Sequence, residues 1–182
     1  MKIHHRCAAG YVPRLTPHAS RLTIVIMLAM VLSSCGFQLR GAASLPFETL
    51  HIQATSGSQF ANQLRRVITN GSQTKIVDSP KEAQATVQLL GEAREKSILS
   101  LSGGGRVREY QLSYRVSYRV VGRDNRETIA RTEIALRRDL SYNDNDTLSK
   151  ESEEALLYRD MQSDAVGQLM RQLQAARAPA KT

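Results

Sequence analysis

Hydrophobic positions divide the chain into segments with two periodicities. Residues 49–55, 85–101, 110–121 and 127–138 alternate between apolar and polar side chains, which is typical of strands that bury one face. Residues 148–176 instead space their apolar side chains three and four positions apart, and so does the segment between Ser56-Gly57-Ser58 and Asn70-Gly71. This spacing predicts two amphipathic helices. A short strand at 74–77 lies between the first helix and the longer strands.

This order of elements predicts the fold class. A strand, a helix, further strands and a long helix indicate an α+β fold. We expect two helices packed on one face of a four- or five-stranded mixed sheet, an αβ sandwich. The domain should cover residues 47–177, a normal length for a chain with one hydrophobic core, and the tail 178–182 should be disordered.

Residues 110–121 form the clearest of the predicted strands. Tyr110, Tyr114 and Tyr118 share one face with leucine and valine side chains. A row of tyrosines can stack on sugars, but at a period of two among aliphatic residues it more often lies in a sheet core. On residues 85–101 the expected apolar side carries Ala85, Val87, Leu89 and Ala93.

The strand at 127–138 is expected to pair back on residues 110–121. Its even positions, from Thr128 to Leu136, are the more apolar ones. Matching the two apolar faces sets Tyr114 opposite Ile134, Leu112 opposite Leu136 and Arg115 opposite Glu133. We therefore predict an Arg115–Glu133 charge pair worth at most about 1 kcal/mol. A loop rich in Asn and Asp should follow at 139–146.

The N-terminal part of the chain has the pattern of a bacterial lipoprotein signal. An uncharged run from Leu22 to Leu32 follows a basic segment without acids, and Leu32-Ser33-Ser34-Cys35 ends the run. We expect residues 1–34 to be cleaved, Cys35 to carry lipid, and residues 35–46 to form an extended tether. Several acyl chains on one residue give a permanent membrane anchor. An ordinary secretory signal that happens to contain a cysteine is the alternative.

Removing the signal changes how composition is interpreted. The whole chain has a formal charge of +8, but four unopposed basic residues leave with residues 1–34, so the expected mature chain has about +4. This modest charge and the expected compartment argue against nucleic acid as a partner. Cys7 is removed and Cys35 is acylated, so no disulfide is expected. His51 is then the only histidine, and no nucleophile motif or metal-ligand cluster stands out, so we predict a non-enzyme without metal or other cofactor.

Charge is distributed unevenly along the mature chain. Residues 94–138 hold eleven basic and five acidic residues, whereas residues 139–164 hold two basic and eight acidic ones. This pattern is compatible with a solvated bipolar surface or with hairpin tips that meet an anionic ligand. Gly103-Gly104-Gly105, flanked by Lys96, Arg106 and Arg108, reads as such a tip and lacks the spacing of a phosphate-binding loop. Asp144-Asn145-Asp146 begins like a calcium loop, but Ser149 and Ala155 stand where glycine and glutamate are needed.

Several motifs of the mature chain resemble one known family. The motifs are Cys35-Gly36-Phe37-Gln38-Leu39-Arg40-Gly41, Glu109-Tyr110-Gln111-Leu112, the segment from Arg138 to Tyr142 with Asp144, Leu148-Ser149-Lys150, and Met161 with Asp164. In these the chain resembles LptE, the lipopolysaccharide-assembly lipoproteins of Gram-negative outer membranes. The resemblance implies the same α+β sandwich.

The resemblance also implies a function and a set of residues. It implies a lipid-anchored protein on the periplasmic side of the outer membrane that plugs the LptD β-barrel, binds lipopolysaccharide and assists its insertion into the outer leaflet. Lys150 matches a family lysine linked to lipopolysaccharide binding. A family arginine of the hairpin loop is replaced here by glycine, so Arg106 or Arg108 is expected to act in its place. The alternative is a generic periplasm-facing lipoprotein, such as a transport-complex auxiliary or a secretion pilotin.

Overall fold

The computed structural model describes residues 44–143 and 146–176. The predictions for the signal segment, Cys35, most of the tether, Asp144-Asn145 and the C-terminal tail concern residues outside these ranges. Seven elements follow in order: β1 (Thr49–Gln53), α2 (Gln59–Gly71), β2 (Lys75–Ile76), β3 (Ala85–Leu101), β4 (Val107–Gly122), β5 (Glu127–Ser141) and α3 (Thr147–Ala175).

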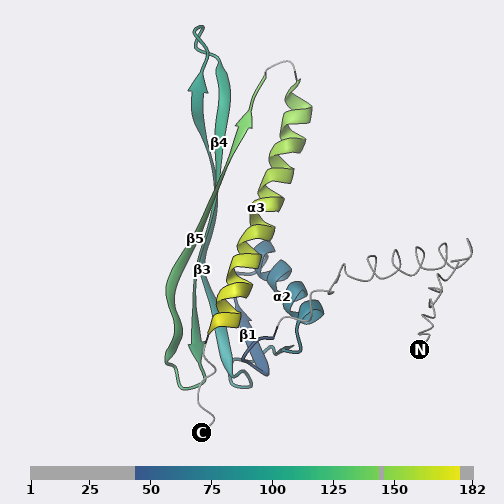
Figure 1. The fold of residues 1–182 in the computed structure, drawn as a ribbon, viewed down its shortest axis with the longest axis vertical. Helices are drawn as coiled ribbons and strands as arrows, with labels where there is room; N and C mark the ends of the chain where they lie inside the picture. The colour runs from purple at the N-terminus through teal and green to yellow at the C-terminus, as the bar shows by residue number, and fades with distance from the viewer. Residues whose placement is uncertain (1–43, 144–145, 177–182) are drawn as a thin grey trace, which may run out of the picture. The chain divides into compact units, whose positions relative to one another are not determined.

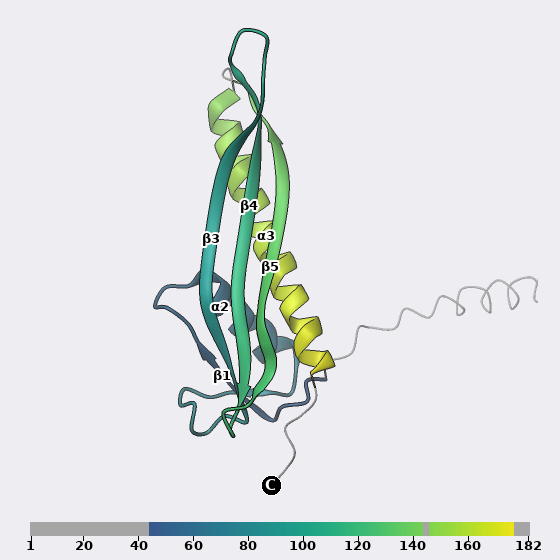
Figure 2. The ribbon, with the colours of Figure 1, turned by 90° about the vertical axis from the view of Figure 1, so that its left-hand side faces the viewer.

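The five strands form one mixed sheet, and both helices lie on the same side of it. The strand order is β2-β1-β3-β4-β5, with β1 parallel to its two neighbours and the other pairs antiparallel. Figures 1 and 2 show α3 running along the three long strands, while α2 and the short strands lie at one end of them. The predicted α+β architecture is confirmed.

The core lies between this sheet face and the two helices. From β4 it takes Leu112, Tyr114, Val116, Tyr118 and Val120, none of which is exposed to solvent. The tyrosine row therefore belongs mainly to the sheet core, as the period predicted. The predicted apolar ridge of α3 is buried from Met161 to Leu173. At the start of α2, the Ser58 hydroxyl accepts a hydrogen bond from the Ala61 amide, which caps the helix.

A bulge in β3 reverses the orientation of its side chains. Leu89 pairs with Tyr118, but Gly91 pairs with Ser117, so Leu90 is one residue more than β4 provides. Beyond this point Glu92, Arg94 and Lys96 share the helix-facing side with Val116, Tyr114 and Leu112. The prediction that Ala93 lies on the same side as Leu89 is therefore wrong.

The pairing of β4 with β5 also differs from the predicted register. Val121 pairs with Glu127 at the turn, as expected, but two irregularities near Tyr118 and Val120 shift the rest by two residues. Tyr114 then lies opposite Leu136, Leu112 opposite Arg138, and Arg115 opposite Ala135. The predicted Arg115–Glu133 pair is wrong: Arg115 forms its ion pair with Glu95 of β3, and Glu133 accepts a hydrogen bond from Ser117.

Strand β5 is longer than the alternation predicted. Asp139 and Leu140 pair with Gln111 and Tyr110, and Leu140 is buried in the core. The loop predicted from residue 139 therefore begins only after Ser141. The polar Asp139 was interpreted as the start of a loop, but its side chain lies on the face of the strand away from the core.

Candidate functional site

The β3–β4 hairpin ends in a tight turn that carries Arg106. The Ser102 amide donates to the Arg106 carbonyl at 2.7 Å, and the Gly105 amide donates to the Ser102 carbonyl at 2.9 Å. Gly105 has a φ of +77°, a conformation that side chains with a Cβ rarely adopt. The glycine run is therefore the hairpin tip predicted from the sequence.

Arg106 and Arg108 are exposed, and their side chains form no hydrogen bond or ion pair with other described residues. Only the backbone of Arg108 is engaged, because its carbonyl accepts a hydrogen bond from the Tyr142 amide at 2.7 Å. Two guanidinium groups thus remain available to an anion at this end of the sheet.

A cluster of two tyrosines and a lysine lies below the tip. The rings of Tyr110 and Tyr142 meet edge to face, with centroids 5.1 Å apart. The Lys96 ammonium lies 4.2 Å from the centroid of the Tyr110 ring and 2.6 Å from a carboxylate oxygen of Glu154 on α3. The hydrogen bond to Glu154 raises the pKa of Lys96, so this lysine stays charged.

Lys150 lies in the first turns of α3, close to this cluster. Its ammonium pairs with the Glu153 carboxylate at 2.8 Å, and its side chain is 20% exposed. Glu154, which binds Lys96, is four positions further along, so Lys150 and Glu154 share one face of the helix. Lys150 therefore lies one helical turn before the partner of Lys96, and the start of α3 lies at the same end of the domain as the hairpin tip (Figures 1 and 2). The structure records no contact of Arg106 or Arg108 with Lys150 among the described residues.

The same end also exposes large apolar side chains that the sequence analysis did not single out. They are Ile98, Leu99, Leu101 and Leu148. Leu148 is the most exposed, at 81%, and it begins α3 near Lys150. The run Ile98-Leu99-Ser100-Leu101 breaks the alternation of polar and apolar positions, and this irregularity was the available signal. We call these four residues, with Lys96, Arg106, Arg108 and Lys150, the hairpin-end surface.

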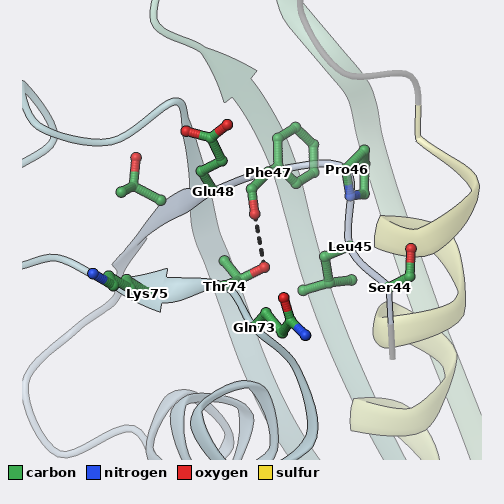
Figure 3. A pocket seen from close by; sticks show the side chains of 9 residues that line it. Ser44, Leu45, Pro46, Phe47, Glu48, Gln73, Thr74 and Lys75 are labelled. Carbon is green, nitrogen blue, oxygen red and sulfur yellow. Dashed lines mark hydrogen bonds between the residues drawn. The ribbon is translucent and has the colours of Figure 1, made fainter. Parts of the chain in front are cut away.

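A second concave region lies at the other end of the sheet, where the described chain begins. Its volume is about 650 Å³, and it is lined by residues 44–49 and 73–75. Figure 3 shows Leu45 beside Gln73 and Thr74, with the Thr74 hydroxyl donating to the Phe47 carbonyl at 2.7 Å. This bond joins the segment before β1 to the segment before β2. The pocket carries one lysine and no cluster of groups suited to catalysis.

Two further observations concern the described residues as a set. None of their His, Cys, Asp and Glu side chains gather in groups of three or more that could hold a metal ion. Among the described helices, none combines the length and the apolar character that crossing a bilayer requires. Cys35, the predicted lipidation site, lies outside the described ranges.

Comparison with known proteins gives consistent matches. The family model described as "LptE: Lipopolysaccharide-assembly" matches residues 47–173. A protein of Photorhabdus laumondii named LPS-assembly lipoprotein LptE is 28% identical over 158 residues, which cover 84% of each chain. A Yersinia pestis protein of the same name is also 28% identical over 158 residues, 84% of this chain and 74% of the relative.

Solved structures agree with this match. An uncharacterized lipoprotein B from Nitrosomonas europaea has a TM-score of 0.69 and 43% identity, over 77% of this chain and 91% of its own. The rare lipoprotein B from Shewanella oneidensis has a TM-score of 0.60 and 26% identity, over 70% of this chain and 94% of its own. The family match over residues 47–173 covers all five strands, α2 and most of α3.

Proposed function

The chain belongs to the LptE lipopolysaccharide-assembly family, and from this we propose that it helps a β-barrel partner, LptD, to insert lipopolysaccharide into the outer leaflet of the outer membrane. In this proposal a lipid on Cys35 anchors the chain to the periplasmic side of that membrane. The folded domain plugs the barrel, and the hairpin-end surface binds lipopolysaccharide. The role is binding and positioning rather than catalysis.

The chemistry of the hairpin-end surface is the observation that carries the proposal. Lipopolysaccharide combines phosphate groups with acyl chains, so a surface that binds it needs cations beside apolar side chains. Arg106 and Arg108 supply guanidinium groups without a partner among the described residues, and Ile98, Leu99, Leu101 and Leu148 supply exposed apolar area within the same end. A solvated hairpin tip that lacked a ligand would have no need of the apolar residues.

Lys150 takes part less directly in this arrangement. Its ammonium is already paired with Glu153, and its neighbour Glu154 is paired with Lys96. An incoming phosphate would compete with these carboxylates, which are exposed enough to move. We therefore assign Lys150 to the edge of the surface, and Arg106 and Arg108 to its first contact with phosphate.

Charge reversal tests the assignment of these three residues. Arg106→Glu, Arg108→Glu and Lys150→Glu together should weaken the binding of lipopolysaccharide by the mature lipoprotein in detergent about tenfold or more, because each lost contact is a charge-assisted one. The matched control is Lys81→Glu, Arg131→Glu and Arg137→Glu, which makes the same change of net charge at exposed positions elsewhere. Equal affinity of the two triple variants would remove the three residues from the site.

Purification tests the partner independently of the ligand. The proposal expects a large β-barrel protein to remain bound when the lipidated protein is extracted from outer membranes. A generic lipoprotein, such as a transport auxiliary or pilotin, would leave without a barrel. Membership of the LptE family favours the first result.

A further inference from the structure

A groove between the two helices has a lining unlike that of the hairpin-end surface. It has a volume of about 450 Å³ and lies where α2, α3 and the bulged part of β3 meet. Three arginines, four side-chain amides, a serine and an alanine line it: Arg66, Arg94, Arg159, Gln59, Asn62, Gln63, Gln162, Ser163 and Ala155. The lining contains no carboxylate and no large apolar side chain. It therefore offers positive charge and hydrogen bonds, but nothing that suits an apolar ligand.

Hydrogen bonds hold the floor of this groove in one arrangement. The Gln63 amide donates to Ser163 at 2.8 Å and accepts from Gln162 at 2.6 Å. Arg94 donates to the side-chain oxygens of Gln162 at 2.8 Å and Gln59 at 2.9 Å. This chain joins β3 to both helices, and Gln162 at its centre is only 7% exposed. The amides are therefore positioned before any ligand arrives, which lowers the entropy lost on binding.

The guanidinium of Arg94 is fixed by aromatic rings as well. Its central carbon lies 5.7 Å from the centroid of Tyr114 and 5.5 Å from that of Tyr158. Both distances are within the range of cation–π attraction. Arg94 faces the groove because of the bulge at Leu90, which turns this part of β3 toward the helices.

Arg66 and Arg159 are exposed and, unlike Arg94, form no ion pair or hydrogen bond with other described residues. Among the acids of α3, Glu154 binds Lys96 and Asp164 binds Arg138, and Asp160, which follows Arg159, does not line the groove. The groove therefore holds three guanidinium groups whose charge no lining residue neutralises.

We propose that this groove is a binding site for a phosphorylated sugar, separate from the hairpin-end surface. A phosphate carries close to two negative charges at neutral pH, and it matches several arginines better than a single carboxylate does. The amide and hydroxyl groups of the floor suit the hydroxyls of a sugar ring, and the volume suits one or two rings. Arg159 lies nine positions after Lys150 on α3, about 13 Å along the helix axis, so the two surfaces can be tested separately.

The test uses the mature lipidated protein in detergent micelles, with ligands added during NMR observation of its backbone and side-chain amides. The probe is glucose 6-phosphate, and the comparison ligands are glucose, inorganic phosphate and glutamate. We expect saturable shifts at α2 and α3 around Gln63 and Gln162 with glucose 6-phosphate, and weaker binding of the other three.

Variants identify the groups responsible. Arg66→Gln with Arg159→Gln should weaken glucose 6-phosphate binding about tenfold or more. Arg131→Gln with Arg171→Gln is the matched control, because it removes two exposed arginines that do not line the groove. Similar losses in both variants would overturn the proposal, as would the absence of saturable shifts or shifts confined to the hairpin end.

The comparison ligands give further outcomes. Equal binding of inorganic phosphate would overturn the sugar specificity, and equal binding of glutamate would indicate a site for an acidic protein segment instead. The phosphorylated core oligosaccharide released from lipopolysaccharide should bind more tightly than glucose 6-phosphate if the envelope polymer is the source of the sugar. The opposite order would support a free sugar phosphate as the ligand of the same site.

Discussion

At the scale of single residues, the tyrosines of β4 join the core to the polar groups around it. The Tyr114 hydroxyl donates to a Glu92 carboxylate oxygen at 2.8 Å, and the Tyr118 hydroxyl donates to the side-chain oxygen of Gln172 on α3. Both rings are fully buried. The tyrosines thus fill the sandwich while their hydroxyls reach partners at its rim, which satisfies the one polar atom that each brings inside.

Burial makes these tyrosines sensitive to high pH. Desolvation raises the pKa of Tyr118 to about 12, and desolvation with the hydrogen bond to Glu92 raises that of Tyr114. A raised folded-state pKa contributes stability that is complete below the unfolded value near 10 and is lost as the pH rises toward the folded value. The free energy of unfolding, measured with urea, should therefore fall between pH 10 and 12.

The variant Tyr118→Phe checks the origin of that fall. It should reduce the slope of stability against pH in this range, because phenylalanine cannot ionise. The slope that remains belongs to Tyr114, Tyr158 and Lys96, whose pKa values are also raised. An unchanged slope in the variant would show that Tyr118 ionises equally easily in the folded and unfolded states.

At the scale of elements, periodicity predicted the bounds of the long strands and helices well. It could not predict the register between strands, because the pairing is irregular. The predicted range of β3 matches the structure, and that of α3 differs by one residue at each end, because long periodic segments carry many positions that agree. The register of β5 could not be found this way. The two single-residue shifts together move β5 by two residues relative to β4. Because side chains alternate with a period of two, the same side chains of β5 face the core in both registers.

The bulge at Leu90 could not be predicted for a related reason. Glu92, Arg94 and Lys96 face the helices after the bulge, where a simple alternation places Ala93. Charged residues usually indicate a solvated face, but here they bind partners on α2 and α3. The groove between the helices was missed partly for the same reason, since Arg94 faces it only through this reversal.

Inserting an alanine between Gly91 and Glu92 should therefore cost much more than truncating Leu90. The insertion turns Glu92, Arg94 and Lys96 away from the helices and should lower the free energy of unfolding by more than about 2 kcal/mol. Leu90→Ala keeps the register and removes a side chain that is 45% exposed, so its cost should stay below about 1 kcal/mol. Urea unfolding of both variants measures the difference, and similar midpoints would contradict this role of the bulge.

Helix α3 should be less stable in its first part than in its second. No residue from Thr147 to Leu157 is buried, whereas the core residues begin at Tyr158. Hydrogen exchange measured by mass spectrometry should be faster in the first part. Because the Lys96–Glu154 and Lys150–Glu153 pairs are screened by salt, 1 M NaCl should speed this exchange about two- to fivefold. Peptides of α2 serve as the control, since its buried residues hold it without ion pairs among the described residues.

At the scale of the whole molecule, some of the basic and acidic residues that are separated along the sequence form ion pairs with one another in the fold. The basic strands and the acidic start of α3 meet in the pairs Lys96–Glu154 and Arg138–Asp164, at 2.6 and 2.9 Å. The sequence left a solvated bipolar surface and a ligand-binding one as alternatives. The structure shows a third role for these charges, because ion pairs between them join α3 to β3 and β5.

The lipid anchor remains a prediction at this scale. Precursor carrying Cys35 should yield a mature protein whose mass exceeds that of residues 35–182 by several acyl chains, and it should sediment with membranes. Cys35→Ala should incorporate no labelled palmitate, whereas Cys7→Ala should behave like the unaltered protein because residue 7 is removed with the signal. Palmitate in the Cys35→Ala variant would place the lipid elsewhere.

The length of β4 sets the distance between the start of β1 and the tip of the β3–β4 hairpin. The chain enters β1 level with Gly122, and the hairpin turn follows Leu101 at the opposite end of the strand. Sixteen residues at about 3.3 Å each give roughly 50 Å, which exceeds the full thickness of a bilayer, about 40–45 Å. The folded domain can therefore present the hairpin-end surface roughly 50 Å from the segment that precedes β1, with no part of the domain unfolding to cover the distance.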